Sequence, residues 1–181
     1  GDGVFISTTG VGIVHEGVDL SGDRVRPGDA ILVSGTIGDH GMAIMSRRED
    51  LQFDAPIVSD TASLHELVAQ LLRTGADLRV LRDPTRGGLA ATLNELAKQS
   101  RVGMMLDEEA IGVQPAVEAA CELLGLDPLY VANEGKLVVV CAAADADRVL
   151  MALQAHPLGQ GRWVRHPQPP STIGTNQPEP G

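Results

Sequence analysis

The sequence predicts an α+β fold in which a mixed β-sheet is covered by helices. Short runs of Val, Leu and Ile alternate along the chain with longer segments whose apolar residues recur every three or four positions. Glycine, proline and aspartate separate many of these runs, which is typical of the turns between strands and helices. A protein that alternates strands with amphipathic helices commonly packs the helices on a sheet.

Composition excludes several classes of protein. The chain has 181 residues, of which 43% are hydrophobic and 2% aromatic, and its formal net charge is −10. Nucleic-acid-binding proteins usually present basic surfaces that neutralise phosphates, so we expect no nucleic-acid partner. No apolar run approaches the roughly 20 residues of a membrane helix. Cys121 and Cys141 cannot form a disulfide framework, which favours a cytoplasmic protein.

Three regions are predicted along the chain. Residues 1–28 read as a linker strand or strands entering the domain, because β-forming residues alternate with small ones over 4–14. Residues 29–160 carry the alternating strand and helix patterns of the domain. Residues 161–181 hold five of the 11 prolines and no apolar period, so we expect a disordered tail. The strand-like start without a methionine suggests a segment of a longer protein.

The domain opens with a predicted strand over Ala30–Val33. A turn with glycines at positions 35, 38 and 41 follows the strand and leads to a helix over Met42–Arg48. The next helix, Asp60–Thr74, carries leucines at spacings of three and four on one face. Ser63 and Glu66 predict a capping box at its start.

In the middle of the domain, the pattern of apolar residues predicts a strand, a helix and a second strand. Leu78–Leu81 is a short apolar run, and the helix after Gly87 and Gly88 has a leucine face. Val102–Leu106 alternates in the manner of a strand.

The last third predicts a helix, two strands and a final helix. Pro115 suits the first turn of the helix and Gly125 its end. The strands are expected at Leu129–Ala132 and Leu137–Ala142, and Asp145 is expected to cap the final helix. Cys121 and Cys141 both fall on apolar faces, so we expect small core residues.

One candidate functional loop is the segment 83–88. Arg86 can bind a phosphate through two nitrogens, and the glycines after it let a ligand approach the backbone. The start of the following helix also favours an anion. Asp83 could hold a cation or orient Arg86. The same residues are equally compatible with a plain strand–turn–helix junction.

Two further loops carry polar residues. Glu134 and Lys136 lie between two apolar strands, where packing does not require them, and a carboxylate there could serve as a general base; a polar hairpin turn is the simpler interpretation. The glycine-bearing turn 34–41 is a weaker candidate, with His40 interpreted as a hydrogen-bonded structural residue. The sequence contains no Walker motif or dinucleotide fingerprint, and its histidines lack metal-ligand spacing.

Four segments together resemble one family: VSGTIGDHGMAIMSRRE, SDTASLHELVAQLL, LRDPTRGGLAATLNELA and AIGVQPAVEAACELLGLDPLYVANEGKLV. They are similar to the C-terminal domain of the HypE family of hydrogenase maturation proteins, a branch of the aminoimidazole ribonucleotide synthetase superfamily. The resemblance runs from Gly3 to Gln160, and the pairing of DPTRGG with LDPLYVANEGKL is specific.

The resemblance implies an ATP-dependent carbamoyl dehydratase. Such an enzyme receives a carbamoyl group from HypF on a C-terminal cysteine and converts it to a thiocyanate. The cyanide then passes to iron on the HypC–HypD scaffold for a [NiFe]-hydrogenase. ATP and Mg2+ are implied as cofactors, and a homodimer is implied for the full-length protein.

The resemblance also implies roles for individual residues. Those expected near the phosphates of ATP are Asp83, Thr85, Arg86, Gly87, Gly88 and Asn133. Glu134 is the implied catalytic base, with Lys136 as a second catalytic residue beside it.

Two departures from the family bear on activity. The N-terminal domain that carries much of the nucleotide site is absent, and so is the terminal cysteine that accepts the carbamoyl group. We therefore expect this chain to be inactive alone. Two alternatives stay open: an enzyme domain from the selenophosphate or purine-pathway branches of the superfamily, and an interaction domain without catalysis.

Overall fold

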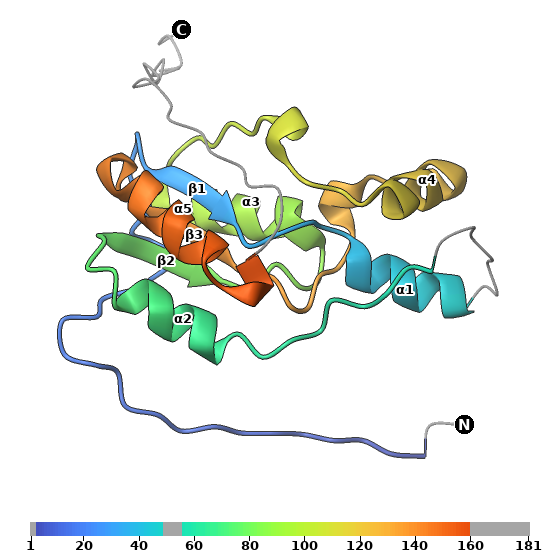
Figure 1. Cartoon of the computed structure of the whole chain (residues 1–181), viewed down its shortest axis with the longest axis horizontal. Coiled ribbons are helices and arrows are strands. Elements are labelled where there is room, and N and C mark those ends of the chain that lie inside the picture. Colours follow the sequence, from blue (N-terminus) through green and yellow to red (C-terminus); the bar gives the residue numbers. More distant parts are fainter. Residues whose placement is uncertain (1–2, 49–55, 160–181) are drawn as a thin grey trace, which may run out of the picture.

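The computed structural model describes residues 3–48 and 56–159, and within them a small antiparallel sheet forms the centre of the fold. The strands are β1 (Ala30–Val33), β2 (Leu78–Arg82) and β3 (Val138–Cys141). They lie in the order β1-β3-β2, with both outer strands antiparallel to β3 (Figure 1). The predicted α+β class is confirmed. In the described residues, parallel pairing is limited to an isolated bridge between Ile37 and Val113, so the sheet itself is antiparallel rather than mixed.

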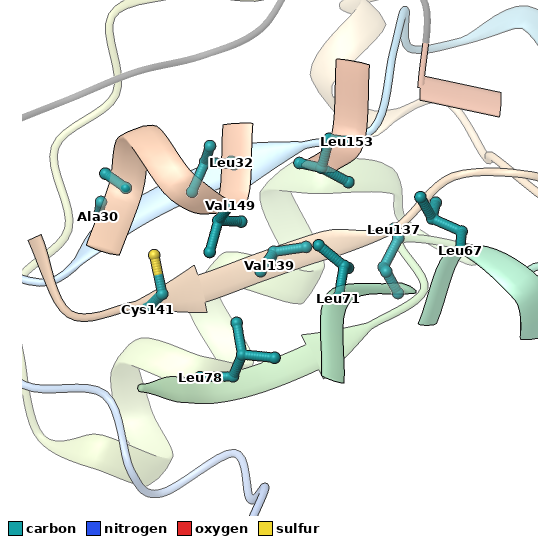
Figure 2. Packing of buried hydrophobic residues seen from close by; sticks show 11 residues of the cluster. Ala30, Leu32, Leu67, Leu71, Leu78, Leu137, Val139, Cys141, Val149 and Leu153 are labelled. Carbon is teal, nitrogen blue, oxygen red and sulfur yellow. The ribbon is translucent and has the colours of Figure 1, made fainter. Parts of the chain in front are cut away.

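Helices cover both faces of this sheet. Over the described ranges, the α-helices are α1 (Asp39–Arg48), α2 (His65–Leu72), α3 (Gly88–Ser100), α4 (Pro115–Leu124) and α5 (Ala146–Gln154). Helices α2 and α5 pack on one face, where Leu71 and Val149 meet Val139 of the central strand (Figure 2). Helix α3 packs on the other face, where Leu93 meets the cluster that contains Val140. Among the described helices, none has the length and apolarity needed to cross a membrane.

The central strand is buried on both faces because side chains alternate along a strand. Val138 and Val140 belong to the core under α3, while Val139 and Cys141 belong to the core under α2 and α5. All four residues are buried. Burial of such a side chain contributes roughly 1.5–3 kcal/mol, so β3 is the strand on which both cores depend.

Helices α1 and α4 form a third apolar cluster outside the two sheet faces. Met42 of α1 packs with Val117 and Cys121 of α4 and with Val131. Val131 lies two residues before Asn133, and the Gly41 N–H of α1 donates to the Ala132 carbonyl at 3.0 Å. The cluster therefore fixes the start of α1 relative to the segment around Val131.

Three predicted strands are absent from the described part of the chain. Residues 4–14 form no strand, and their apolar side chains are exposed, with Val11 fully so. In 102–106, the even-numbered residues are partly buried and the odd ones exposed, but no neighbouring strand pairs with them. Residues 128–130 form a 3-10 turn instead of the strand predicted at 129–132. Alternation predicts which side chains face the core, whereas a strand also needs a hydrogen-bonding partner.

Two predicted helix caps are also wrong. Helix α2 begins at His65 rather than Asp60, and Leu64 precedes it without a side-chain cap, because Ser63 Oγ contacts His65 Nδ1 at 2.8 Å. The carboxylate of Asp145 accepts a hydrogen bond from the Asp77 N–H at 2.9 Å rather than from its own helix. Both side chains are captured by groups other than the helix N–H groups. The predicted bounds of α4, at Pro115 and Gly125, are confirmed.

Both cysteines are free thiols in the core, as predicted. Burial is the main cause, and the neighbouring Asp145 carboxylate a second, of the rise in the pKa of the Cys141 thiol to about 12. The thiol therefore stays protonated at neutral pH and acts as a small apolar group. The tail predicted at 161–181 lies outside the described residues.

Candidate functional site

The side chain of Asn133 joins three loops that are far apart in the sequence. Its Oδ1 accepts a hydrogen bond from the Gly38 N–H at 2.8 Å. Its Nδ2 donates to the carbonyl oxygens of Pro84 and Val131, both at 3.0 Å. Asn133 is fully buried. We call the meeting point of the segments 34–41, 83–88 and 131–136 the three-loop junction. All the sequence-predicted site residues lie in two of these segments.

Glycine is required at the junction where backbones approach each other. Gly88 is buried, has a φ of +64°, and lies against the segment 129–131. A Cβ at this position would overlap the carbonyl oxygen of Leu129 and lie 2.7 Å from that of Val131. The overlapping atoms belong to the backbone, so no side chain could move to relieve the overlap. Glycine at this position therefore allows the start of α3 to pack directly against the segment before Asn133.

Alanine at Gly88 should therefore lower the free energy of unfolding by about 2–5 kcal/mol, through backbone overlap and left-handed strain. Urea denaturation of the chain measures this change. Gly103→Ala is a matched control, because Gly103 has open space around its Cβ position and an ordinary φ; we expect a change within about 0.5 kcal/mol. If Gly88→Ala and Gly103→Ala changed the free energy of unfolding equally, the backbone contact at Gly88 would not be as close as described.

The DPTRGG loop presents its polar side chains to solvent. Asp83 and Arg86 are exposed, and Thr85 Oγ1 donates to Asp83 Oδ2 at 3.2 Å. The Gly88 N–H donates to the Thr85 carbonyl at 3.1 Å as α3 begins. Within the described residues Arg86 forms no ion pair, so its guanidinium is available to an anion. The loop thus offers one exposed cation beside the start of a helix.

Glu134 lies at the surface of the junction beside His40. The Glu134 side chain is 45% exposed, and its Oε1 is 4.0 Å from His40 Nε2. His40 belongs to the first turn of α1, and its Nδ1 lies 2.8 Å from Ser59 Oγ. Sequence reasoning interpreted His40 only as a structural residue. His40 lies in the glycine-bearing turn 34–41, which is of the same kind as the loops 83–88 and 133–136. That position is the sequence feature that could have indicated a functional role for His40.

Lys136 points into the protein rather than toward solvent. Its Nζ lies 3.2 Å from Asp60 Oδ2 and 3.8 Å from Asp39 Oδ2, and all three side chains are nearly buried. Asp39 also accepts a 2.6 Å hydrogen bond from Thr36 Oγ1. Burial raises the pKa of Asp39, and the Thr36 bond and the Lys136 charge oppose that rise. The ammonium of Lys136 thus compensates two buried carboxylates. Sequence analysis did not identify Asp39 or Asp60.

A cavity of about 680 Å³ opens beside this charge cluster. Its walls include the turn Ser34–Asp39, the segment 56–60, the start of α4 and the Gly135-Lys136 pair. Many of the lining side chains are apolar, such as Ile57 and Leu158. The size and the mixture of apolar walls with a few charges are typical of a small-molecule site. Lys136 reaches this cavity, whereas Glu134 and residues 83–88 are outside its lining.

The described residues include no group of three His, Cys, Asp or Glu side chains arranged to hold a metal ion. Magnesium bound with a nucleotide commonly needs only one or two carboxylates, together with water and phosphate oxygens. The exposed carboxylate of Asp83, close to Arg86 and the start of α3, fits that lesser requirement.

Comparison with known proteins agrees with this architecture. Residues 26–162 match the family described as AIR synthase related protein, C-terminal domain. The carbamoyl dehydratase HypE of Cupriavidus necator is 68% identical over 160 residues, which cover 88% of this chain and 46% of the relative. The chain thus spans about half the length of the curated relatives it matches.

Solved structures show the same similarity. A HypE–HypF complex superposes with a TM-score of 0.81 at 47% identity, covering 84% of this chain and 50% of that one. A HypE in complex with ATP superposes with a TM-score of 0.76 at 51% identity, covering 80% of this chain and 43% of that one. The fold, the junction and the extent of the match have one explanation: this chain belongs to the family of AIR synthase related protein C-terminal domains.

Proposed function

We propose that this chain is the C-terminal part of an ATP-dependent carbamoyl dehydratase, which converts a C-terminal S-carboxamide to a thiocyanate for the cyanide ligands of [NiFe]-hydrogenase. The observation that carries the proposal is the 68% identity to a carbamoyl dehydratase over 160 residues. Those residues include the loop 83–88 and the loop 133–136, which Asn133 holds together.

The reaction needs a proton acceptor and an anion site. The carboxamide oxygen takes the terminal phosphoryl group of ATP and later leaves as phosphate, while the carboxamide nitrogen loses both its protons and forms the C≡N bond. We assign proton acceptance to Glu134, whose exposed carboxylate can reach a substrate. We assign phosphate binding to Arg86 and to the N–H groups at the start of α3, with Thr85, Gly87 and Gly88 shaping that loop.

The buried residues of the predicted site fit supporting roles. Asn133 uses its side chain on three protein groups, so we propose that it acts by holding the phosphate loop and the base in register. Lys136 is enclosed with Asp39 and Asp60. We propose that its charge fixes the shape of the loop that carries Glu134 and forms one wall of the neighbouring cavity.

Ligands and partners of the enzyme form part of the same proposal. ATP is supported by the structure of a HypE in complex with ATP, and Mg2+ is proposed to accompany it at Asp83. HypF is supported as a partner by the HypE–HypF complex. Transfer to HypC–HypD, a homodimer and a cytoplasmic location complete the proposal; the two free cysteines suit a reducing compartment.

A chimera tests this proposal. The matched 160 residues of the Cupriavidus necator relative are replaced by the corresponding segment of this chain, while the remaining segments supply the missing half and the terminal cysteine that the HypE resemblance implies. With the cysteine S-carbamoylated using ¹⁸O-labelled carboxamide, we expect Mg·ATP to convert it to a thiocyanate, by mass spectrometry, and to place the label in phosphate.

A folded chimera that binds ATP but leaves the carboxamide intact would overturn the catalytic proposal. If that chimera still bound HypF, the interaction-domain alternative would be favoured instead. The unmodified relative, treated in parallel, shows that the assay itself works.

A further inference from the structure

We infer that His40 is a positioning residue for Glu134, acting through a proton held on its Nε2 atom. The inference rests on the proposed function, because Glu134 matters as a base only if the enzyme removes protons. It is carried by a chain of contacts that begins on the segment 59–61, passes through the imidazole ring and ends at the Glu134 carboxylate.

The contacts made by Nδ1 fix the orientation of the His40 imidazole ring. Nδ1 lies 2.8 Å from Ser59 Oγ, and Ser59 Oγ lies 2.9 Å from Thr61 Oγ1. The Thr61 backbone N–H also donates to Ser59 Oγ at 3.3 Å. The segment 59–61 is itself held close to the Glu134 loop, since Gly135 packs against the backbone of Asp60. The ring is therefore anchored to the same loop that carries the base.

The partners on the two sides of the ring together assign its proton. A serine hydroxyl has one hydrogen to donate and two lone pairs to accept with. If the Thr61 N–H and the Thr61 hydroxyl both donate to Ser59 Oγ, both lone pairs are used and the Ser59 hydrogen points at Nδ1. Nδ1 is then the acceptor, so the neutral ring carries its proton on Nε2. The Thr61 hydroxyl also lies 3.4 Å from Nδ1, and a hydrogen from either hydroxyl makes Nδ1 the acceptor. The opposite tautomer would instead set the lone pair of Nε2 against the Glu134 carboxylate, which only accepts hydrogen bonds.

The Nε2–H then faces Glu134 Oε1 across 4.0 Å. That separation is longer than a hydrogen bond, and catalytic contacts are often long before the substrate binds. Glu134 is 45% exposed, so without a partner its side chain would sample several rotamers. A donor on the ring favours the rotamer in which Oε1 faces Nε2, and it leaves the second carboxylate oxygen to accept the proton. Misplacement of a reacting group by about 1 Å can reduce a rate 100-fold.

Two substitutions of His40 distinguish the role of Nε2 from that of Nδ1. Glutamine places an N–H donor near the position of His40 Nε2, whereas asparagine places its amide near Nδ1 and leaves Glu134 without a donor. In the chimera we expect His40→Asn to reduce kcat roughly 10- to 100-fold with unchanged affinity for ATP, and His40→Gln to recover most of that loss. Equal kcat values for the two variants would overturn the inference.

A second measurement needs no activity. Long-range ¹H–¹⁵N NMR of this chain should show His40 with its proton on Nε2, and Glu134→Gln should shift that ¹⁵N signal. Ser59→Ala should disturb the tautomer; Ser63→Ala, which removes the same 2.8 Å serine–histidine contact at His65, should leave His40 unchanged. An Nδ1-protonated ring would overturn the inference. If the chimera without further substitutions is inactive but the NMR result is as expected, the proposed function is rejected and the placement of the His40 proton stands.

Discussion

Alanine in place of Asn133 is expected to lower the free energy of unfolding of this chain by about 2–5 kcal/mol. The substitution leaves the N–H of Gly38 and the carbonyl oxygen of Val131 without the buried partner that the Asn133 side chain supplies. The Pro84 carbonyl loses the side-chain donor but keeps the backbone N–H of residue 133 at 3.3 Å. Each buried polar group left without a partner costs about 1–3 kcal/mol, and some of that cost is recovered when the loops separate and admit water.

Urea denaturation measures the loss, and two further variants interpret it. Asn94→Ala removes an exposed asparagine of α3 that bonds only its own helix, so a change below about 0.5 kcal/mol is expected. Asn133→Asp keeps the acceptor for Gly38 but brings a buried charge opposite two carbonyl oxygens, so it should be at least as destabilising as alanine. A small effect of Asn133→Ala would mean that the loops meet without its help.

Glutamine in place of Glu134 is expected to reduce kcat of the chimera by about 10²–10⁴, the usual contribution of a general base. The change preserves the size of the side chain and removes only its ability to accept a proton. Because Glu134 is half exposed and lies outside the sheet cores, the stability of the chain should hardly change. Affinity for ATP should also persist, since we assign the phosphates to the loop 83–88.

Single-turnover measurement of thiocyanate formation tests this expectation, with ATP binding measured on the same samples. Glu122→Gln supplies the control, because Glu122 is an exposed residue of α4 away from the junction. Turnover by Glu134→Gln within a factor of a few of the unmodified chimera would remove Glu134 from the role of base. The base would then have to be sought in the other half of the enzyme.

Elements with strong local signals could be predicted from the sequence. The strand Ala30–Val33 was predicted with its observed bounds, and Pro115 and Gly125 correctly mark α4. Proline suits a helix start and glycine suits the left-handed residue that ends it, whatever the rest of the chain does. The glycine-bearing loops were also recognisable as candidates, although the sequence alone did not distinguish a binding loop from a plain turn.

Contacts between distant residues could not be predicted in this way. Nothing near Asn133 in the sequence indicates that it bonds Gly38 and Pro84, and nothing near Lys136 points to Asp60. For the same reason His40 was separated from Glu134, although both were noticed as individual residues. The strand predicted at 102–106 was wrong for a related reason: its alternation is visible locally, but the existence of a partner strand is a property of the whole fold.

The position of β3 in the sheet has a consequence for the synthesis of the protein. β1 and β2 are made early, but neither pairs with the other, and each waits for β3 near the end of the domain. The nascent chain therefore leaves the ribosome with both apolar sheet faces incomplete until Val138–Cys141 has emerged. Folding that depends on such distant pairings is slow, and exposed strands of this kind are prone to aggregation. A stop codon shortly before Val138 would leave two orphan strands and a substrate for chaperones and proteases.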